Sequence, residues 1–291
     1  MRSTRSIIHK TILLLCVCAA ASWNGCVSDV PHDNPLDPLS ANPESGALLS
    51  GRVVLKNQTS VGIAGAVVTA LPGLTIAIAD SQGYFSFQNP STNLQAVVAR
   101  KSNFVTDTTA VTLARGESRQ VTITMNAVPT IPSVRILTRK IDQWWPNPIY
   151  SAMVSASADD LNGLGDLDSV WVSIDSLSFG MTYSVADKNF QTVIFNSQLP
   201  SNSLEWLIGR QFFVRARDQN KSVGVSAPAY AARIIDNEAT PVFPALQDTA
   251  SSSPEFQWTP PSSVFPYSYT IAVVRLDAGT QTVIWTQSCI V

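Results

Sequence analysis

From residue 50 onward, short runs of β-forming residues alternate with turn signals at intervals of about ten residues. This spacing is typical of antiparallel β-sandwiches, which join many short strands through tight turns. Charged residues make up 14% of the chain, against roughly 25% in average soluble proteins, and Val, Thr, Ser and Ala are abundant. We therefore expect an all-β protein, built from serial antiparallel β-sandwiches that follow a cleaved signal and a disordered tether.

The first predicted domain covers residues 50–127. In its last predicted strand, Val121, Ile123 and Met125 alternate with polar residues, as in a strand with one buried face. The tetrapeptide Asp80-Ser81-Gln82-Gly83 predicts a type I turn, in which the Asp80 carboxylate holds backbone N–H groups. The predicted strands are residues 51–55, 66–71, 74–79, 84–87, 94–100, 106–113 and 119–125.

Three motifs in this block resemble the carboxypeptidase regulatory-like domain. The resemblance implies a seven-stranded, transthyretin-like sandwich with an accessory, non-catalytic role. It also implies that Gly65 and Gly83 are turn residues and that Phe85 and Phe87 include a core aromatic. The motifs are Gly51-x-Val53, residues 63–68 (IAGAVV) and Asp80-x-x-Gly83-Tyr84-Phe85-x-Phe87.

The second predicted domain covers residues 128–237. In residues 211–218, Phe212, Val214 and Ala216 alternate with Phe213 and two arginines, as expected for a half-solvated strand. This segment resembles the penultimate strand of a fibronectin type III domain, so an immunoglobulin-like or fibronectin type III sandwich is implied. The predicted strands are residues 133–137, 150–156, 169–174, 178–185, 190–195, 211–218 and 230–235.

The third predicted domain, residues 238–291, resembles the first half of a fibronectin type III domain, with Trp258 in the position of its core tryptophan. About fifty residues are too few for the roughly 90 to 100 that such a sandwich needs. Two interpretations stay open. Either the chain is truncated, or the half-sandwich pairs with another partner through its open edge.

Residues 1–25 predict an export signal, because Arg2, Arg5 and Lys10 precede an apolar run at residues 11–21. The run is shorter than the about 20 residues that a membrane span needs. The segment resembles a bacterial lipoprotein signal with cleavage before Cys26, although Trp23 and Asn24 depart from that pattern. The alternative is ordinary cleavage near residues 20–22. Lipidation of Cys26 would anchor the protein to a membrane.

Residues 26–49 predict a disordered, proline- and acid-rich tether. Its motif DNPLDP, residues 33–38, resembles tethers of lipoproteins in bacteria with two membranes, although a plain linker explains it equally well. The resemblance implies an extracytoplasmic protein anchored to the outer membrane, on its periplasmic or surface face. Losing the three basic residues of the signal changes the net charge from −2 to −5. Nucleic acid is therefore not an expected partner, because no basic stripe is present.

Catalytic motifs are absent from the sequence. The two histidines, His9 and His32, lie in the signal and the tether, so the predicted domains contain none. This excludes histidine-based nucleophile systems, histidine general bases and histidine-ligated zinc. No nucleophile elbow, P-loop or dinucleotide fingerprint occurs. Paired-carboxylate hydrolysis stays open, because Asp and Glu residues could supply two acids, but no pair stands out. We predict that the protein is not an enzyme.

The densest cluster of oxygen-bearing side chains is at residues 159–168. Calcium binds six to eight oxygens, and Asp160, Asn162, Asp166 and Asp168 are spaced suitably along a loop. The alternative is an Asx-rich turn that joins two strands. These four residues are the candidate calcium ligands, and we expect no other cofactor.

Trp144 and Trp145 adjoin Pro146, and two adjacent aromatic residues cannot both face inward on a strand. One of them is a candidate for stacking on a sugar, or it covers the end of a sandwich. Three functions therefore remain open. The first is a non-enzymatic, lipid-anchored envelope protein that presents β-sandwiches for adhesion, assembly or recognition, with an envelope protein as partner. The second is a carbohydrate-binding accessory protein with a glycan ligand, and the third is a calcium-stiffened structural spacer.

Overall fold

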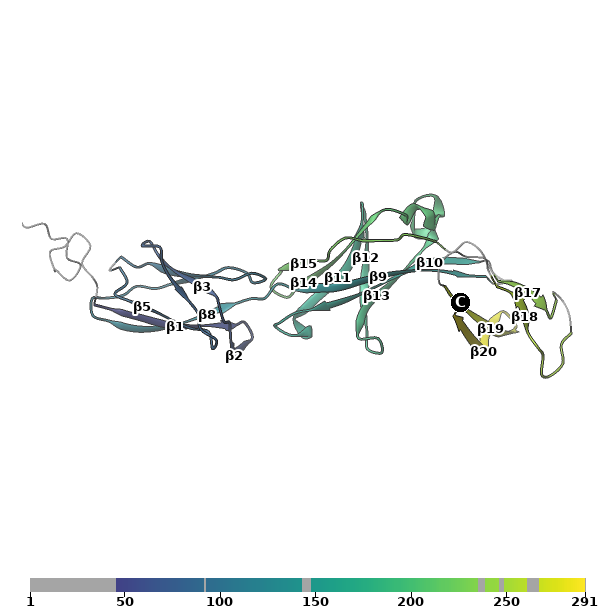
Figure 1. The fold of residues 1–291 in the computed structure, drawn as a ribbon, viewed down its shortest axis with the longest axis horizontal. Helices are drawn as coiled ribbons and strands as arrows, with labels where there is room; N and C mark the ends of the chain where they lie inside the picture. Colours follow the sequence, from purple (N-terminus) through teal and green to yellow (C-terminus); the bar gives the residue numbers. More distant parts are fainter. Residues whose placement is uncertain are drawn as a thin grey trace, which may run out of the picture. The chain divides into compact units, whose positions relative to one another are not determined.

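The computed structural model describes residues 46–91, 93–142, 148–234, 239–245, 249–260 and 267–290 (Figure 1). These residues form mostly antiparallel β-sheets with a few short 3-10 helices, which confirms the predicted all-β class. The chain divides into two compact units, unit 1 up to Ala127 and unit 2 from Val128 onward. None of the described helices has the length and apolar character needed to cross a membrane.

Unit 1 contains two four-stranded sheets, with strand orders β4-β3-β6-β7 and β2-β1-β5, the latter extended by β8 beside β1. The buried side chains of both sheets form one core, which includes Leu49, Val68, Val97 and Ile123. The strands are β1 (Leu48–Leu55), β2 (Gln58–Gly62), β3 (Val67–Leu71), β4 (Thr75–Ile78), β5 (Tyr84–Gln88), β6 (Ala96–Arg100), β7 (Asp107–Ala110) and β8 (Ser118–Met125).

The alternation predicted for the last strand of unit 1 is confirmed. Ile123 and Met125 are fully buried and Val121 packs against the same core, while the intervening threonines are exposed. The pairing differs from the expected antiparallel pattern, because β8 runs parallel to β1, from Leu48 opposite Ser118 to Leu55 opposite Met125. A parallel pair needs a long crossover, and here the intervening strands supply it.

The turn at residues 80–83 forms as predicted. Oδ1 of Asp80 accepts hydrogen bonds from the backbone N–H groups of Gln82 and Tyr84, each at 2.8 Å. The backbone N–H of Gly83 donates to the carbonyl of Asp80 at 3.0 Å. Beyond this turn, Phe85 and Phe87 of β5 are both buried and pack edge-to-face, so both are core aromatics.

Unit 2 contains one sheet path with the order β15-β14-β11-β12-β13-β10-β9, and β16 also pairs with β14. β12 pairs with β11 through its first half and with β13 through its second half. The strands are β9 (Thr130–Ile141), β10 (Ile149–Asp159), β11 (Leu167–Ile174), β12 (Leu177–Ser184), β13 (Asn189–Phe195), β14 (Gln211–Asp218), β15 (Val223–Val225) and β16 (Ala229–Tyr230); the 3-10 helices are η1 (Leu164–Asp166), η2 (Asn196–Gln198), η3 (Pro200–Asn202) and η4 (Leu204–Leu207).

β14 lies at the centre of the unit 2 core and confirms its predicted alternation. Phe212, Val214 and Ala216 are fully buried, whereas Phe213 and Arg215 are half-buried. The neighbouring strand β11 contributes Val172 to the same cluster, and β10 and β13 contribute Val154 and Ile194.

The C-terminal part of unit 2 forms two two-stranded sheets, β17 (Thr240–Phe243) with β18 (Gln257–Thr259), and β19 (Ser268–Asp277) with β20 (Thr280–Ile290). Trp258 is half-buried, and its Nε1–H donates to the Tyr269 hydroxyl at 2.7 Å. This bond joins the two small sheets. The role of Trp258 as the core tryptophan of a fibronectin type III domain stays a prediction.

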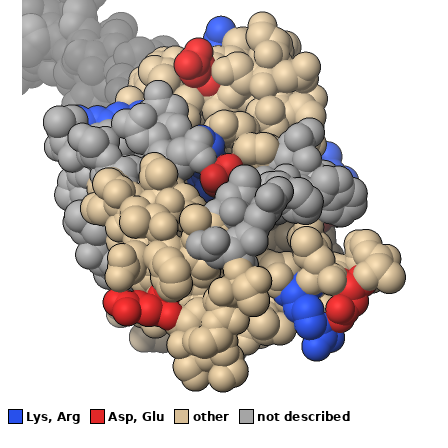
Figure 2. All heavy atoms as spheres, turned by 90° about the vertical axis from the view of Figure 1, so that its right-hand side faces the viewer, with Lys and Arg blue, Asp and Glu red and all other residues tan. Residues whose placement is uncertain are grey.

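The low content of charged residues is visible on the surface of the protein (Figure 2). On the face shown in Figure 2, most described residues are uncharged, with a few Lys, Arg, Asp and Glu side chains among them. Buried acidic side chains are therefore the more informative feature of this molecule, and three of them lie in unit 2.

Candidate metal centre

The predicted oxygen-rich loop connects β10 to β11. β10 ends at Asp159, and η1 begins at Leu164. Between them, Gly163 adopts φ 106° and ψ 153°, a conformation that favours glycine. The Gly163 N–H donates to the carbonyl of Asp160 at 2.8 Å, and the Asp166 N–H donates to that of Gly163 at 2.9 Å. The loop therefore folds back on itself and brings Asp160 close to Asp166.

A third acid reaches this loop from the end of β14. Leu167 of β11 pairs with Asp218 of β14, which places Asp218 beside Asp166. The backbone N–H of Gln219 donates to the carbonyl of Asp166 at 2.9 Å, and its side-chain Nε2 donates to that of Gly165 at 2.9 Å. Sequence reasoning missed Asp218, because it lies about fifty residues away, in a segment identified only as a strand.

The carboxylates of Asp160, Asp166 and Asp218 converge. One ligand oxygen from each lies within 4.8 Å of the others, and the side chains are only 4%, 6% and 0% exposed. Oδ1 of Asp160 accepts from the Asn162 backbone N–H at 2.7 Å, and Oδ1 of Asp218 accepts from that of Ser222 at 2.8 Å. Oδ2 of Asp160 is buried and has no hydrogen-bond partner. We call these three residues the acidic triad.

The electrostatics of the acidic triad oppose ionisation of Asp160. Burial raises the pKa of Asp160 from its ordinary 3.8 to about 6; the Asn162 N–H works against this rise, and the charges of Asp166 and Asp218 add to it. A buried carboxylate whose second oxygen has no donor costs free energy unless a proton or a cation compensates it. The site therefore favours the binding of a proton or a cation.

We expect the calcium-free protein to lose stability as the pH rises from about 4 to about 7. The folded pKa of Asp160 is about 6, above its ordinary 3.8, so the folded state binds more protons across this window. The contribution is fully present below 3.8 and disappears as the pH passes 6. Its size is about 3 kcal/mol, at 1.36 kcal/mol for each pKa unit. Denaturant unfolding of the wild type and of an Asp160→Asn variant at several pH values measures this contribution. If the free energy of unfolding depends on pH in the same way in both proteins, the prediction is contradicted.

The chemistry of the acidic triad fits calcium. The ion prefers carboxylate, amide and carbonyl oxygens, bound at about 2.3 to 2.6 Å. Two oxygens on opposite sides of one such ion are about 5 Å apart, and all three carboxylates fall within that limit. Asn162, which is buried in the same loop, carries an amide oxygen of the kind that calcium accepts. The triad can thus supply three carboxylate ligands, and Asn162 stays a predicted fourth.

The fourth predicted ligand, Asp168, has a different role. Oδ2 of Asp168 lies 2.8 Å from Nη2 of Arg217 and 3.7 Å from Nζ of Lys221, and the side chain is 35% exposed. The hydrogen bond from Arg217 and the charge of Lys221 lower the pKa of Asp168. Asp168 is the extra residue of a β-bulge in β11, between Leu167 opposite Asp218 and Ser169 opposite Arg217, and its side chain is exposed. Asp168 is thus held in a surface ion pair and lies outside the group of converging carboxylates, to which Asp218 belongs.

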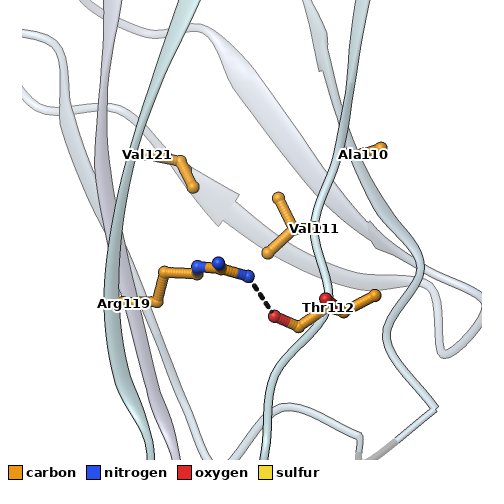
Figure 3. Close-up of a pocket in the computed structure, with 5 residues that line it drawn as sticks. All are labelled: Ala110, Val111, Thr112, Arg119 and Val121. Carbon is orange, nitrogen blue, oxygen red and sulfur yellow. Dashed lines mark hydrogen bonds between the residues drawn. The ribbon is translucent and has the colours of Figure 1, made fainter.

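Two other predicted sites, lipid attachment at Cys26 and sugar stacking at Trp144 and Trp145, lie outside the described residues. A separate pocket lies in unit 1 between the end of β7 and β8 (Figure 3). Arg119 is the charged residue among its lining side chains and already donates to the Thr112 carbonyl. The pocket residues are Ala110, Val111, Thr112, Arg119 and Val121. The acidic triad is therefore the stronger candidate.

No family model matches this chain, and no curated protein matches it. Among solved structures, a DUF3823 family protein from Bacteroides ovatus has 14% identity and a TM-score of 0.25, covering 64% of this chain and 99% of its own. A "putative carbohydrate binding protein" from Bacteroides uniformis has 8% identity and a TM-score of 0.25, covering 64% and 98%. A tetra-tandem repeat from the extending region of a large adhesion protein has 13% identity and a TM-score of 0.20, covering 84% and 65%. TM-scores this low do not indicate a common arrangement of the whole chain.

Proposed function

We propose that this protein is a non-enzymatic, lipid-anchored spacer of the bacterial cell envelope whose second β unit is stabilised by calcium. The signal-like residues 1–25, Cys26 and the acidic tether support the anchored location. The serial β units then present their loops for adhesion, assembly or recognition. Calcium is the ligand that the described geometry supports best.

A single observation carries the calcium assignment. Three carboxylates meet within 4.8 Å in a buried position, and Oδ2 of Asp160 has no hydrogen-bond donor there. Like charges at this separation repel strongly in a medium of low dielectric constant. A divalent cation removes that repulsion and supplies the missing partner of Oδ2.

The burial of the acidic triad favours a structural role over a catalytic one. A catalytic metal keeps a coordination position open to substrate or water. The triad side chains are at most 6% exposed, which leaves little room for a substrate to reach an ion between them. An ion in this position links the β10–β11 loop to the end of β14 and stabilises the fold.

We expect calcium to raise the melting temperature of unit 2. Calcium that binds the folded state at a hundred times its Kd contributes about 2.7 kcal/mol. For a unit of this size, that corresponds to a shift of about 5 to 10 °C. The measurement is differential scanning calorimetry of the full chain in detergent at pH 7.5, with calcium or with EGTA, and with magnesium as the competing ion.

Two aspartates of the same segment provide the matched comparison. Asp166→Asn removes a member of the acidic triad and should abolish the shift, whereas Asp168→Asn removes only a surface ion pair and should retain it. A wild type that melts at the same temperature with calcium and with EGTA would disprove the calcium-stabilised spacer. A shift that survives in Asp166→Asn would place the ion elsewhere.

A further inference from the structure

The chain enters unit 2 through residues 128–130, which we call the lead-in segment. Pro129 of this segment is buried and lies against Gly224 of β15. A Cβ atom on Gly224 would lie 1.8 Å from the Pro129 carbonyl oxygen. The close approach of these two backbones therefore requires glycine at position 224.

The other neighbour of the lead-in segment is the end of β10. Thr130 is paired with Asp159 in the β9–β10 ladder, and its hydroxyl donates to the Asp159 carbonyl at 3.4 Å. Oδ1 of Asp159 in turn accepts from the backbone N–H of Asp160 at 2.9 Å. Thr130 is thus connected through one residue to the first member of the acidic triad.

The lead-in segment therefore contacts two strands, β10 and β15, that adjoin the residues of the acidic triad in the chain. Asp160 directly follows β10, and Asp218 ends β14 at the turn that leads into β15. The N–H of Ser222 in that turn donates to Oδ1 of Asp218, and β15 begins at the next residue. An ion bound by the triad holds the end of β10 against the β14–β15 turn, and the repulsion among the carboxylates separates them when no ion is bound.

We propose that calcium binding at the acidic triad orders the lead-in segment, so that the ion controls how firmly the chain is held where it enters unit 2. This inference rests on the proposed calcium site and adds a regulatory consequence to it. Calcium concentration then sets the stiffness of the residues that directly follow Ala127, the last residue of unit 1.

Hydrogen exchange with mass spectrometry on the full chain tests this coupling. With calcium at a hundred times its Kd, amides that exchange through opening of the site should exchange roughly a hundredfold more slowly than in EGTA. We expect this in peptides covering residues 158–168, 216–226 and 128–134, and no change in a unit 1 peptide covering residues 96–100. Protection of the first two peptides without the third overturns the inference and leaves the calcium site intact. No protection in any peptide overturns both.

A Gly224→Ala variant separates coupling through β15 from a general tightening of unit 2. The added methyl group displaces the Pro129 carbonyl, so calcium should still protect residues 158–168 while the protection of residues 128–134 falls. Undiminished protection of residues 128–134 in this variant would overturn the coupling through β15. If the variant does not fold, the wild-type comparison between calcium and EGTA decides the matter by itself.

Discussion

Replacing Asp160 with asparagine should stabilise the calcium-free protein at pH 7.5 and abolish its response to calcium. Asparagine has nearly the same shape but no charge, so it removes the cost of a buried carboxylate whose pKa is about 6 in place of 3.8. That cost is about 3 kcal/mol at a pH above both values. The new amide group can also donate to the neighbouring carboxylates of the acidic triad. For a unit of this size, the melting temperature in EGTA should rise by about 6 to 12 °C.

Asp168→Asn is the control for this change. It also replaces a carboxylate with an amide, but at a side chain that lies at the surface. Its carboxylate is held by Arg217 and Lys221, so neutralisation should leave the calcium response unchanged and should not stabilise the protein in EGTA. Calorimetry in EGTA and in calcium measures both variants. If Asp160→Asn melts below the wild type in EGTA, the carboxylate is not a source of strain in the calcium-free fold.

Phe212→Ala should destabilise unit 2 by about 3 to 5 kcal/mol and leave unit 1 unchanged. Phe212 is fully buried at the centre of the unit 2 core, and truncating such a side chain to alanine leaves a cavity. The cores of the two units share no residue among the described parts of the chain. We therefore expect two calorimetric transitions, of which only the one from unit 2 moves to lower temperature.

The neighbouring Phe213 gives a matched control on the same strand. It points to the opposite face of β14, is half-buried and does not belong to the core cluster. Phe213→Ala should therefore lower the unit 2 transition by much less than Phe212→Ala. Equal losses for the two variants would contradict the assignment of the buried face, and a simultaneous fall of both transitions would show that the two units unfold together.

The strands were predictable where alternation is strong. The range of β14, residues 211–218, coincides with the prediction, and Val121, Ile123 and Met125 of β8 face the core as expected. β2, β15 and β20 were not predicted, and of β16 only Tyr230 lies in a predicted strand. β2 and β15 have five and three residues, too few to establish a period. β20 has eleven residues, so length alone does not make a strand predictable.

The acidic triad was predictable only in part. The loop at residues 159–168 was found because its acids are adjacent in sequence, and Asp160 and Asp166 do converge. Asp168 was assigned to the same group because spacing along a loop does not reveal where a strand begins. A β-bulge between Leu167 and Ser169 leaves Asp168 exposed, where it pairs with Arg217 and Lys221. The residues around Asp218 contain no sequence feature that indicates a metal ligand.

The all-β class, the alternation of β8 and β14 and the position of the acidic loop could be read from the amino-acid sequence, because each depends on residues that are close together in the chain. The parallel pairing of β8 with β1 and the place of Asp218 in the acidic triad emerged only from the folded chain. Both follow from strand register, such as Leu167 opposite Asp218. Register is set by packing between segments far apart in the chain, and that packing leaves no pattern in either segment alone.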